Sequence, residues 1–162
     1  MTIARYEARK TVDERSRVAS ERSKRRGGAQ TDVSLPEPVP HILVVDDDEL
    51  IREQIERLYV RSGYVVSPVA TAEDALERLD ARDIDLVVTD IKLPGLSGVE
   101  LTERIQELYP YVPVVVITGH AGIENAVEVR KFGATDYIVK PFSAATIQES
   151  TMRSVREIPR LY

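Results

Sequence analysis

The sequence predicts an α/β domain with a doubly wound sheet of five parallel strands. Short apolar runs alternate with longer amphipathic segments from residue 41 onward. Three of the runs are almost continuous Val, Ile and Leu, which is typical of parallel strands covered on both faces. Five strands that alternate with five helices make a doubly wound α/β sheet.

The apolar runs and the segments between them define the expected elements in chain order. We expect strands at residues 41–45, 64–67, 84–89, 112–118 and 136–140. Apolar residues at helical spacing predict the first helix through Leu50, Ile51, Ile55 and Leu58, and the second through Ala72, Ala75, Leu76 and Leu79. The other helices are expected at roughly 97–109, 121–132 and 143–157.

The first 40 residues differ from the rest of the chain. Their charged residues outnumber their apolar ones, and the apolar ones form no continuous stripe. Prolines at positions 36, 38 and 40 indicate a stiff, extended linker. We therefore expect residues 1–40 to be a disordered charged and proline-rich extension, and residues 41–162 to form the domain.

Composition narrows the function further. The chain has 22 Lys and Arg and 27 Asp and Glu. Residues 1–40 hold nine of the basic and six of the acidic residues, so the domain that follows is acidic. No direct nucleic-acid binding is expected, because such affinity comes largely from basic residues that neutralise phosphates.

The absence of cysteine excludes disulfide scaffolds, thiolate metal sites and a cysteine nucleophile. No apolar run is long enough to span a membrane and no secretory signal is present, so a cytoplasmic protein without membrane contact is predicted.

Polar residues gather where the predicted strands end, and the carboxyl ends of parallel strands are where sites form in such sheets. These residues are Asp46, Asp47 and Asp48 after the first strand, Asp90 after the third, Thr118 after the fourth and Lys140 after the fifth. Taken alone, each has a simpler explanation, and Asp48 is expected to cap the first helix. Together, however, neighbouring carboxylates either raise the pKa of one of them or require a bound cation. Mg²⁺ is a cation that carboxylates bind. Carboxylate, Mg²⁺, Lys and Thr are the parts needed to transfer a phosphoryl group to an aspartate.

Three segments carry a resemblance to a known family. HILVVDDDEL, LVVTDIKLPGLSGVEL and VVVITGHAGIENAVEVRKFGATDYIVKPF closely resemble the receiver domain of two-component response regulators. The resemblance covers about residues 41–157, with the motifs in the family's order and spacing. It implies the (βα)5 flavodoxin-like receiver fold and a phosphoprotein that works with Mg²⁺.

The resemblance also implies a role for each matching residue. Asp90 is expected to accept the phosphoryl group. Asp47, Asp90 and the backbone carbonyl of Lys92 are expected to ligate Mg²⁺, and Asp46 to hold a metal-bound water. Lys140 is expected to pair with the acyl phosphate, and the Lys140–Pro141 bond to be cis.

Two further positions are implied to form a switch. Thr118 would turn its hydroxyl toward the phosphate while the ring of Tyr137 moves inward; alternatively, Tyr137 is only a half-buried strand aromatic. Lys92 and His120 fill the family's two variable positions near the phosphate. They either influence the lifetime of the phosphate or are ordinary loop residues.

The function that follows is a signalling module in a phosphorelay. A single-domain receiver would take phosphate from a histidine kinase or phosphotransfer protein and change the face formed by segments 121–132, 136–140 and 143–157. That face would bind a downstream protein, and a homodimer formed on phosphorylation stays open. The domain would not be an enzyme, although phosphotransfer and autodephosphorylation are intrinsic to it.

Two alternatives remain. A receiver-like scaffold that never accepts phosphate usually lacks an acidic residue, the Lys or the Thr, and all are present here. A Mg²⁺-dependent phosphatase of the haloacid-dehalogenase type would use a D-x-D motif, but Leu50 stands where that family has Thr or Val.

Overall fold

The computed structural model describes residues 38–119 and 126–156. Within these residues, one parallel sheet has the strand order β2-β1-β3-β4-β5. Its strands are β1 (His41–Val45), β2 (Val65–Val69), β3 (Leu86–Asp90), β4 (Val114–Thr118) and β5 (Asp136–Val139). The helices are α2 (Glu49–Arg61), α3 (Ala72–Ala81), α4 (Gly98–Leu108), α5 (Ala126–Lys131) and α6 (Ala144–Arg156). The predicted doubly wound fold is confirmed.

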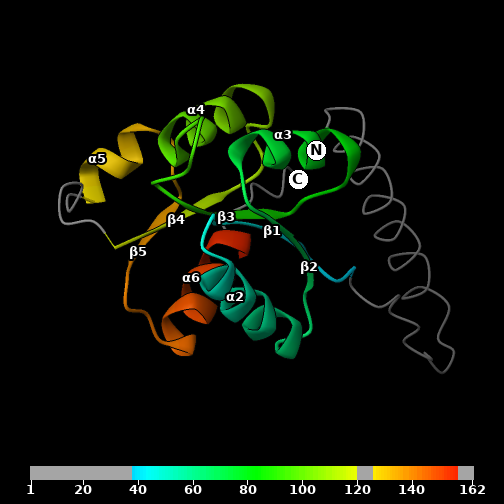
Figure 1. Ribbon diagram of the computed structural model, residues 1–162. Helices are drawn as coiled ribbons and strands as arrows, with labels where there is room; N and C mark the ends of the chain where they lie inside the picture. The colour runs from blue at the N-terminus through cyan, green and yellow to red at the C-terminus, as the bar shows by residue number, and fades with distance from the viewer. Residues whose placement is uncertain (1–37, 120–125, 157–162) are drawn as a thin grey trace, which may run out of the picture. The chain divides into compact units, whose positions relative to one another are not determined.

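The strand order places the point where the winding direction changes between β1 and β3. The chain runs from β1 outward to β2 and then crosses to β3 on the other side of β1. Figure 1 shows the consequence: α2 and α6 cover one face of the sheet, and α3, α4 and α5 cover the other. Because helices leave in opposite directions at β1 and β3, the carboxyl ends of these two strands border an opening in which ligands bind in such folds.

Alternate strand residues build two cores, one on each face of the sheet. In β1, Leu43 and Val45 belong to the core under α3 and α4, whereas Ile42 and Val44 belong to the core under α2 and α6. All four side chains are buried. This two-sided burial is why the strands appear in the sequence as continuous apolar runs.

Capping residues fix where two helices begin beside the carboxyl edge of the sheet. Asp48 caps α2 as predicted, since its Oδ1 accepts the N–H groups of Leu50 at 2.9 Å and Ile51 at 3.2 Å. Ser97 and Glu100 form a capping box at the start of α4. The box limits the connection between β3 and α4 to residues 91–97.

The predicted end of the second strand was wrong. That strand was expected to end at Ser67, whereas β2 continues through Pro68 to Val69. Val65 N–H donates to the carbonyl of Pro40 and the Val69 carbonyl accepts Asp46 N–H, so alternate residues of β2 bond to β1 and to the residues that flank it. Pro68 lies between these positions with its nitrogen toward the free edge of the sheet, where a missing donor breaks no strand pairing.

Other predictions fall partly on residues that the structure does not describe. Of the helix expected at 121–132, the described part is α5, and residues 120–125 lie outside the description. Residues 1–37 of the predicted extension and residues 157–162 also lie outside it. The extension therefore stays a prediction.

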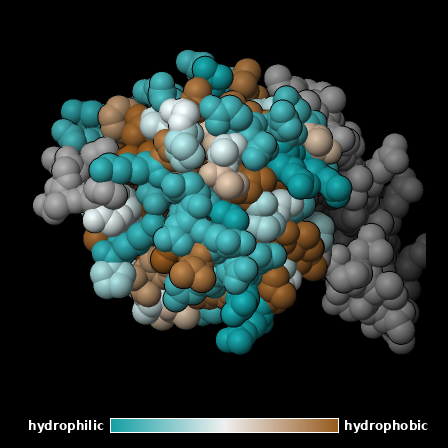
Figure 2. Space-filling view, in the orientation of Figure 1, coloured by the Kyte–Doolittle hydropathy of each residue, from teal (hydrophilic) through white to brown (hydrophobic). Residues whose placement is uncertain are grey.

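The surface of the described residues is mixed. Figure 2 shows hydrophilic residues over much of the face in view, with hydrophobic residues in smaller separate patches. The large hydrophobic side chains that are exposed are Val39, Leu50, Val60, Val65, Leu108, Val139 and Met152. In the described part of the chain, none of the helices has the length and hydropathy needed to cross a membrane.

Candidate functional site

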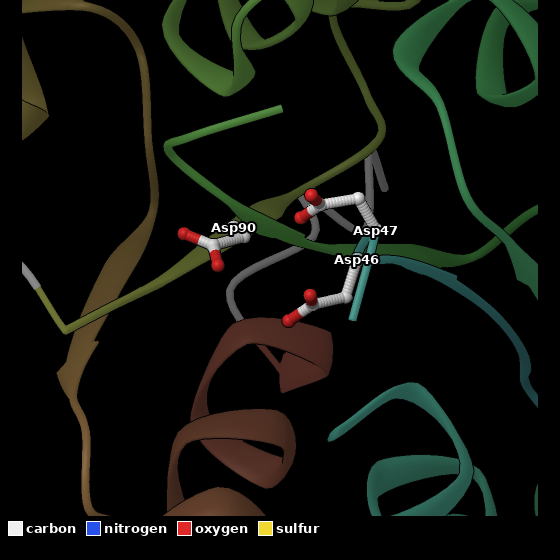
Figure 3. A group of neighbouring side chains, drawn as sticks. All are labelled: Asp46, Asp47 and Asp90. Carbon is white, nitrogen blue, oxygen red and sulfur yellow. The ribbon is translucent and has the colours of Figure 1, made fainter. Parts of the chain in front are cut away.

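Three carboxylates meet at the carboxyl ends of β1 and β3. The register pairs Val45 with Thr89, so the residues that follow each strand emerge side by side. Figure 3 shows Asp46 and Asp47 extending from the end of β1, and Asp90 from the end of β3. One oxygen from each carboxylate lies within 4.8 Å of the others. Parallel pairing thus joins residues 43 or more positions apart into one acidic cluster, as the sequence predicted.

Lys140 brings a cation to this cluster from the end of β5. Its Nζ donates to Asp90 Oδ2 at 2.8 Å and to Asp46 Oδ2 at 3.2 Å. The side chain is 20% exposed, so solvent screens these ion pairs only partly. To reach Asp90, Lys140 passes Gly119 after β4, where an added β-carbon would make ordinary contact with it at 3.7 Å.

The charges in the cluster do not balance, because one lysine serves several carboxylates. Burial raises the pKa of Asp46 above its ordinary value, and this effect outweighs the hydrogen bond from Asp48 N–H and the charge of Lys140. Burial alone would lower the pKa of Lys140, but its hydrogen bond to Asp90 and the charges of Asp46 and Asp90 raise it. A cluster of oxygen ligands with excess negative charge fits a hard divalent cation such as Mg²⁺.

Backbone and side-chain donors hold Asp46 in place. Asp48 N–H donates to Asp46 Oδ1 at 2.9 Å, which leaves Oδ2 for Lys140. The guanidinium of Arg52, on α2, donates to the Asp46 carbonyl at 2.8 Å. Arg52 is not among the site residues that the sequence predicted; the available signal was an arginine one turn after the cap of the helix that follows the acidic residues.

The connection after Asp90 is shaped by glycine. Gly98 N–H donates to the Ile91 carbonyl at 2.8 Å, and a β-carbon at Gly98 would overlap the carbonyl oxygen of Asp90. Lys92 N–H donates to Asp90 Oδ1 at 3.2 Å. Any larger residue at position 98 would therefore displace the backbone that carries Asp90.

The structure also locates the predicted switch residues. Thr118 ends β4 with its side chain buried, and its carbonyl accepts Lys140 N–H at 2.8 Å. Tyr137 lies in β5 opposite Val116 and packs, half-buried, against the core under α3 and α4. Lys92 is exposed on the connection after β3, and His120 lies outside the described residues. The Lys140–Pro141 bond is cis, as the resemblance implied.

The fold and this acidic site agree with what the comparisons with known proteins show. The chain belongs to the response regulator receiver domain family, whose model matches residues 42–151. It is 36% identical over 115 residues to the C4-dicarboxylate transport transcriptional regulatory protein DctD of Rhizobium meliloti strain 1021, a match that covers 71% of this chain and 25% of DctD. The predicted family is therefore confirmed.

Two solved structures show the same relationship. The receiver domain of NtrX from Brucella abortus has a TM-score of 0.68 at 36% identity, over 72% of this chain and 98% of that chain. A CheY-like receiver domain protein from Methanospirillum hungatei JF-1 has a TM-score of 0.70 at 33% identity, over 74% of this chain and 96% of that chain. Both are thus matched almost whole, whereas the chain spans about a quarter of DctD. Receiver domains are signalling domains that interact with histidine kinases or phosphotransfer proteins.

Proposed function

We propose that Asp90 accepts a phosphoryl group from the phosphohistidine of a histidine kinase or phosphotransfer protein. The observation that supports this most directly is the contact of Lys140 Nζ with Asp90 Oδ2 at 2.8 Å, within the cluster of three carboxylates. An Asp90 oxygen attacks phosphorus and the P–O bond forms. The P–N bond breaks, its electron pair stays on the imidazole nitrogen, and that nitrogen takes up a proton.

The residues around Asp90 have separate parts in this proposal. Lys140 exchanges its ion pair with Asp90 for one with the phosphoryl oxygens, and Thr118 donates its hydroxyl to another phosphoryl oxygen. Asp47, Asp90 and the Lys92 carbonyl would hold Mg²⁺ directly, and Asp46 would hold it through water. When bound, the ion would supply positive charge that neutralises the phosphoryl oxygens.

The output is a shift between two states. A phosphoryl group favours the state in which Thr118 and Lys140 contact it, because a ligand biases only states for which its affinity differs. As Thr118 moves, Tyr137 turns inward and changes the face formed by α5, β5 and α6. In β5 of this face, Val139 is exposed and offers an apolar contact to a downstream protein or to a second copy of the chain.

The remaining parts of the proposal concern the setting. Lys92 and His120 adjust the lifetime of the phosphate, and residues 1–40 are an extension outside the receiver domain. The exchange takes place in the cytoplasm, without nucleic-acid or membrane contact by this domain. The chain acts as a phosphoacceptor that loses its own phosphate, and not as an enzyme that turns over a separate substrate.

The test is labelling with a small acyl phosphate donor and Mg²⁺. The parent should gain one phosphoryl group that is stable in acid and labile in base, and Asp90→Asn should gain none. Asp74→Asn changes an exposed carboxylate on α3 and should be labelled like the parent. Equal labelling of Asp90→Asn would refute the assignment. A parent that is never labelled, by this donor or by phosphohistidine, would favour the scaffold.

A further inference from the structure

Glu73 connects α3 to the loop that follows Asp90. It lies in the first turn of α3, and its Oε1 accepts the N–H of Leu96 at 3.1 Å. Residues 73 and 96 are 23 positions apart, so this contact joins the start of α3 to the connection between β3 and α4. Glu73 was not among the site residues that the sequence predicted.

Gly95 makes room for this contact. A β-carbon at Gly95 would lie 2.9 Å from Glu73 Oε1, closer than β-carbons approach other atoms. The φ of Gly95 is +73°, a conformation that L side chains rarely adopt. The glycine therefore serves two purposes: it permits the turn, and it leaves the carboxylate of Glu73 close to the loop backbone.

Other described hydrogen bonds hold the two ends of this loop, and at the end before α4 Ser97 N–H donates to Glu100 Oε2 at 2.9 Å within the capping box. Gly98 N–H closes onto the Ile91 carbonyl at 2.8 Å, and Lys92 N–H donates to Asp90 Oδ1 at 3.2 Å. Leu96 lies toward the far end of the loop, and there the acceptor comes from another helix. A loop fixed at both ends holds the carbonyl between them in fewer orientations, which lowers the entropy lost when that carbonyl binds an ion.

We propose that Glu73 is a positioning residue that holds the loop of residues 91–97, so that the Lys92 carbonyl is already oriented for Mg²⁺. This inference rests on the proposed function, since it assigns Lys92 as a ligand. Glu73 itself touches neither the metal nor the phosphoryl group. It acts through the hydrogen bond to Leu96, and Gly95 leaves the space that the Glu73 carboxylate occupies.

The first experiment compares two substitutions of Glu73 in the full chain. Glu73→Ala removes the acceptor, whereas Glu73→Gln keeps an acceptor oxygen and removes only the charge. Mg²⁺ titration followed by NMR should give a dissociation constant that rises about threefold in Glu73→Ala, the effect of one modest hydrogen bond, and stays near the parent value in Glu73→Gln. Glu77→Ala, one turn further along α3, is the matched control and should bind like the parent.

A second measurement does not depend on the metal. In Mg²⁺-free buffer, the Leu96 amide should exchange with solvent faster in Glu73→Ala than in the parent, while amides in β3 remain protected. The melting temperature reports whether the substitution has acted on the whole fold instead. Gly95→Ala should weaken Mg²⁺ binding in the parent and weaken it less in the Glu73→Ala background, because the steric conflict with the carboxylate is then gone and only the strain of the positive φ remains.

These readouts separate the two proposals. If the parent binds Mg²⁺ and is labelled on Asp90, but Glu73→Ala matches it in metal affinity and Leu96 exchange, the positioning role is wrong and the phosphoacceptor role stands. Glu73→Gln that behaves like Glu73→Ala also overturns the inference, because charge would then be responsible. If the parent fails to bind Mg²⁺ or to be labelled, the proposed function fails, whatever Leu96 exchange shows.

Discussion

Asp46 and Asp136 are acidic residues at opposite edges of the same parallel sheet. Asp46 follows the carboxyl end of β1, and Asp136 begins β5 at the amino edge. Each lies near a basic side chain, Lys140 for Asp46 and Arg153 for Asp136. Their pKa values nevertheless shift in opposite directions.

The difference arises from how many donors each carboxylate receives. At Asp136, Ser150 Oγ and Arg153 Nη2 each donate to Oδ2 at 2.6 Å, and Tyr137 N–H donates to Oδ1 at 2.9 Å. Burial alone would raise the pKa of Asp136, but the hydrogen bonds from Ser150 and Arg153 outweigh it and lower it. At Asp46, burial dominates, and Asp90 adds a second negative charge beside the shared lysine.

Asp136 and Asp46 use their negative charge differently: Asp136 stabilises the fold, whereas Asp46 belongs to a cluster whose excess charge can bind a ligand. The amino edge satisfies its carboxylate within the protein, so that pair favours the folded state. The carboxyl edge keeps more negative charge than its lysine neutralises, which costs stability until a cation arrives. Substitutions at the two edges should therefore affect different measurements.

Lys140→Ala should give the largest effect, and at the carboxyl edge alone. Labelling of Asp90 by a small phosphodonor should slow on the order of 10- to 100-fold, because the phosphoryl oxygens lose a charge-assisted partner. Shifts of β5 amides with a beryllofluoride phosphate mimic should shrink as well. Lys131→Ala removes an exposed lysine from α5 and should leave both measurements unchanged. Normal labelling of Lys140→Ala would remove Lys140 from the chemistry.

Asp47→Ala should separate metal affinity from stability at the carboxyl edge. Losing one direct ligand should weaken Mg²⁺ binding about tenfold, whereas stability without metal should stay within about 0.5 kcal/mol of the parent or rise, because like charges then repel less. The neighbouring Asp48→Ala should show the reverse. It removes the cap of α2, so it should cost about 1 kcal/mol and leave Mg²⁺ affinity nearly unchanged. Metal titration and chemical denaturation measure both; a large loss of metal-free stability in Asp47→Ala would mean that Asp47 is structural.

The sequence predicted the carboxyl edge well because local pattern and topology determine it. A continuous apolar run marks each strand, and parallel pairing brings the ends of different strands to one edge, so Asp46, Asp47, Asp90 and Lys140 could be grouped before their distances were known. The N-cap at Asp48 was predicted for the same reason, since it depends only on neighbouring residues.

The contacts that the sequence did not predict depend on how helices are rotated against the sheet. Ser150 and Arg153 meet Asp136 only because α6 presents that side to the start of β5, and Glu73 meets Leu96 only because α3 and the loop after β3 have fixed relative positions. Spacing along the chain determines neither how a helix is rotated against the sheet nor where it lies relative to a loop. Pro68 likewise depends on tertiary structure, because a proline fits within this strand only when β2 is at the edge of the sheet.

Asp136→Asn should give the smallest effect of the three, on stability alone. The amide keeps an acceptor but loses the charge that Ser150 and Arg153 stabilise. We expect a loss of about 1 kcal/mol at neutral pH, since Arg153 is largely exposed and its ion pair is screened. Labelling of Asp90 and Mg²⁺ affinity should not change. Glu103→Gln, at an exposed position on α4, is the matched control for removing one negative charge.

The pH dependence of this loss provides the most specific test. The folded pKa of Asp136 lies below the ordinary value of 3.8, so the folded state favours the ionised carboxylate. Its contribution to stability is therefore complete well above pH 3.8 and disappears as the pH falls through 3.8 and then through the lower folded pKa. Denaturation of parent and Asp136→Asn at several pH values should give curves that converge in acid and separate toward neutrality. A difference that stays constant across this range would mean that side-chain shape, and not ionisation, accounts for the role of Asp136, and the contrast with Asp46 would then no longer be one of charge balance.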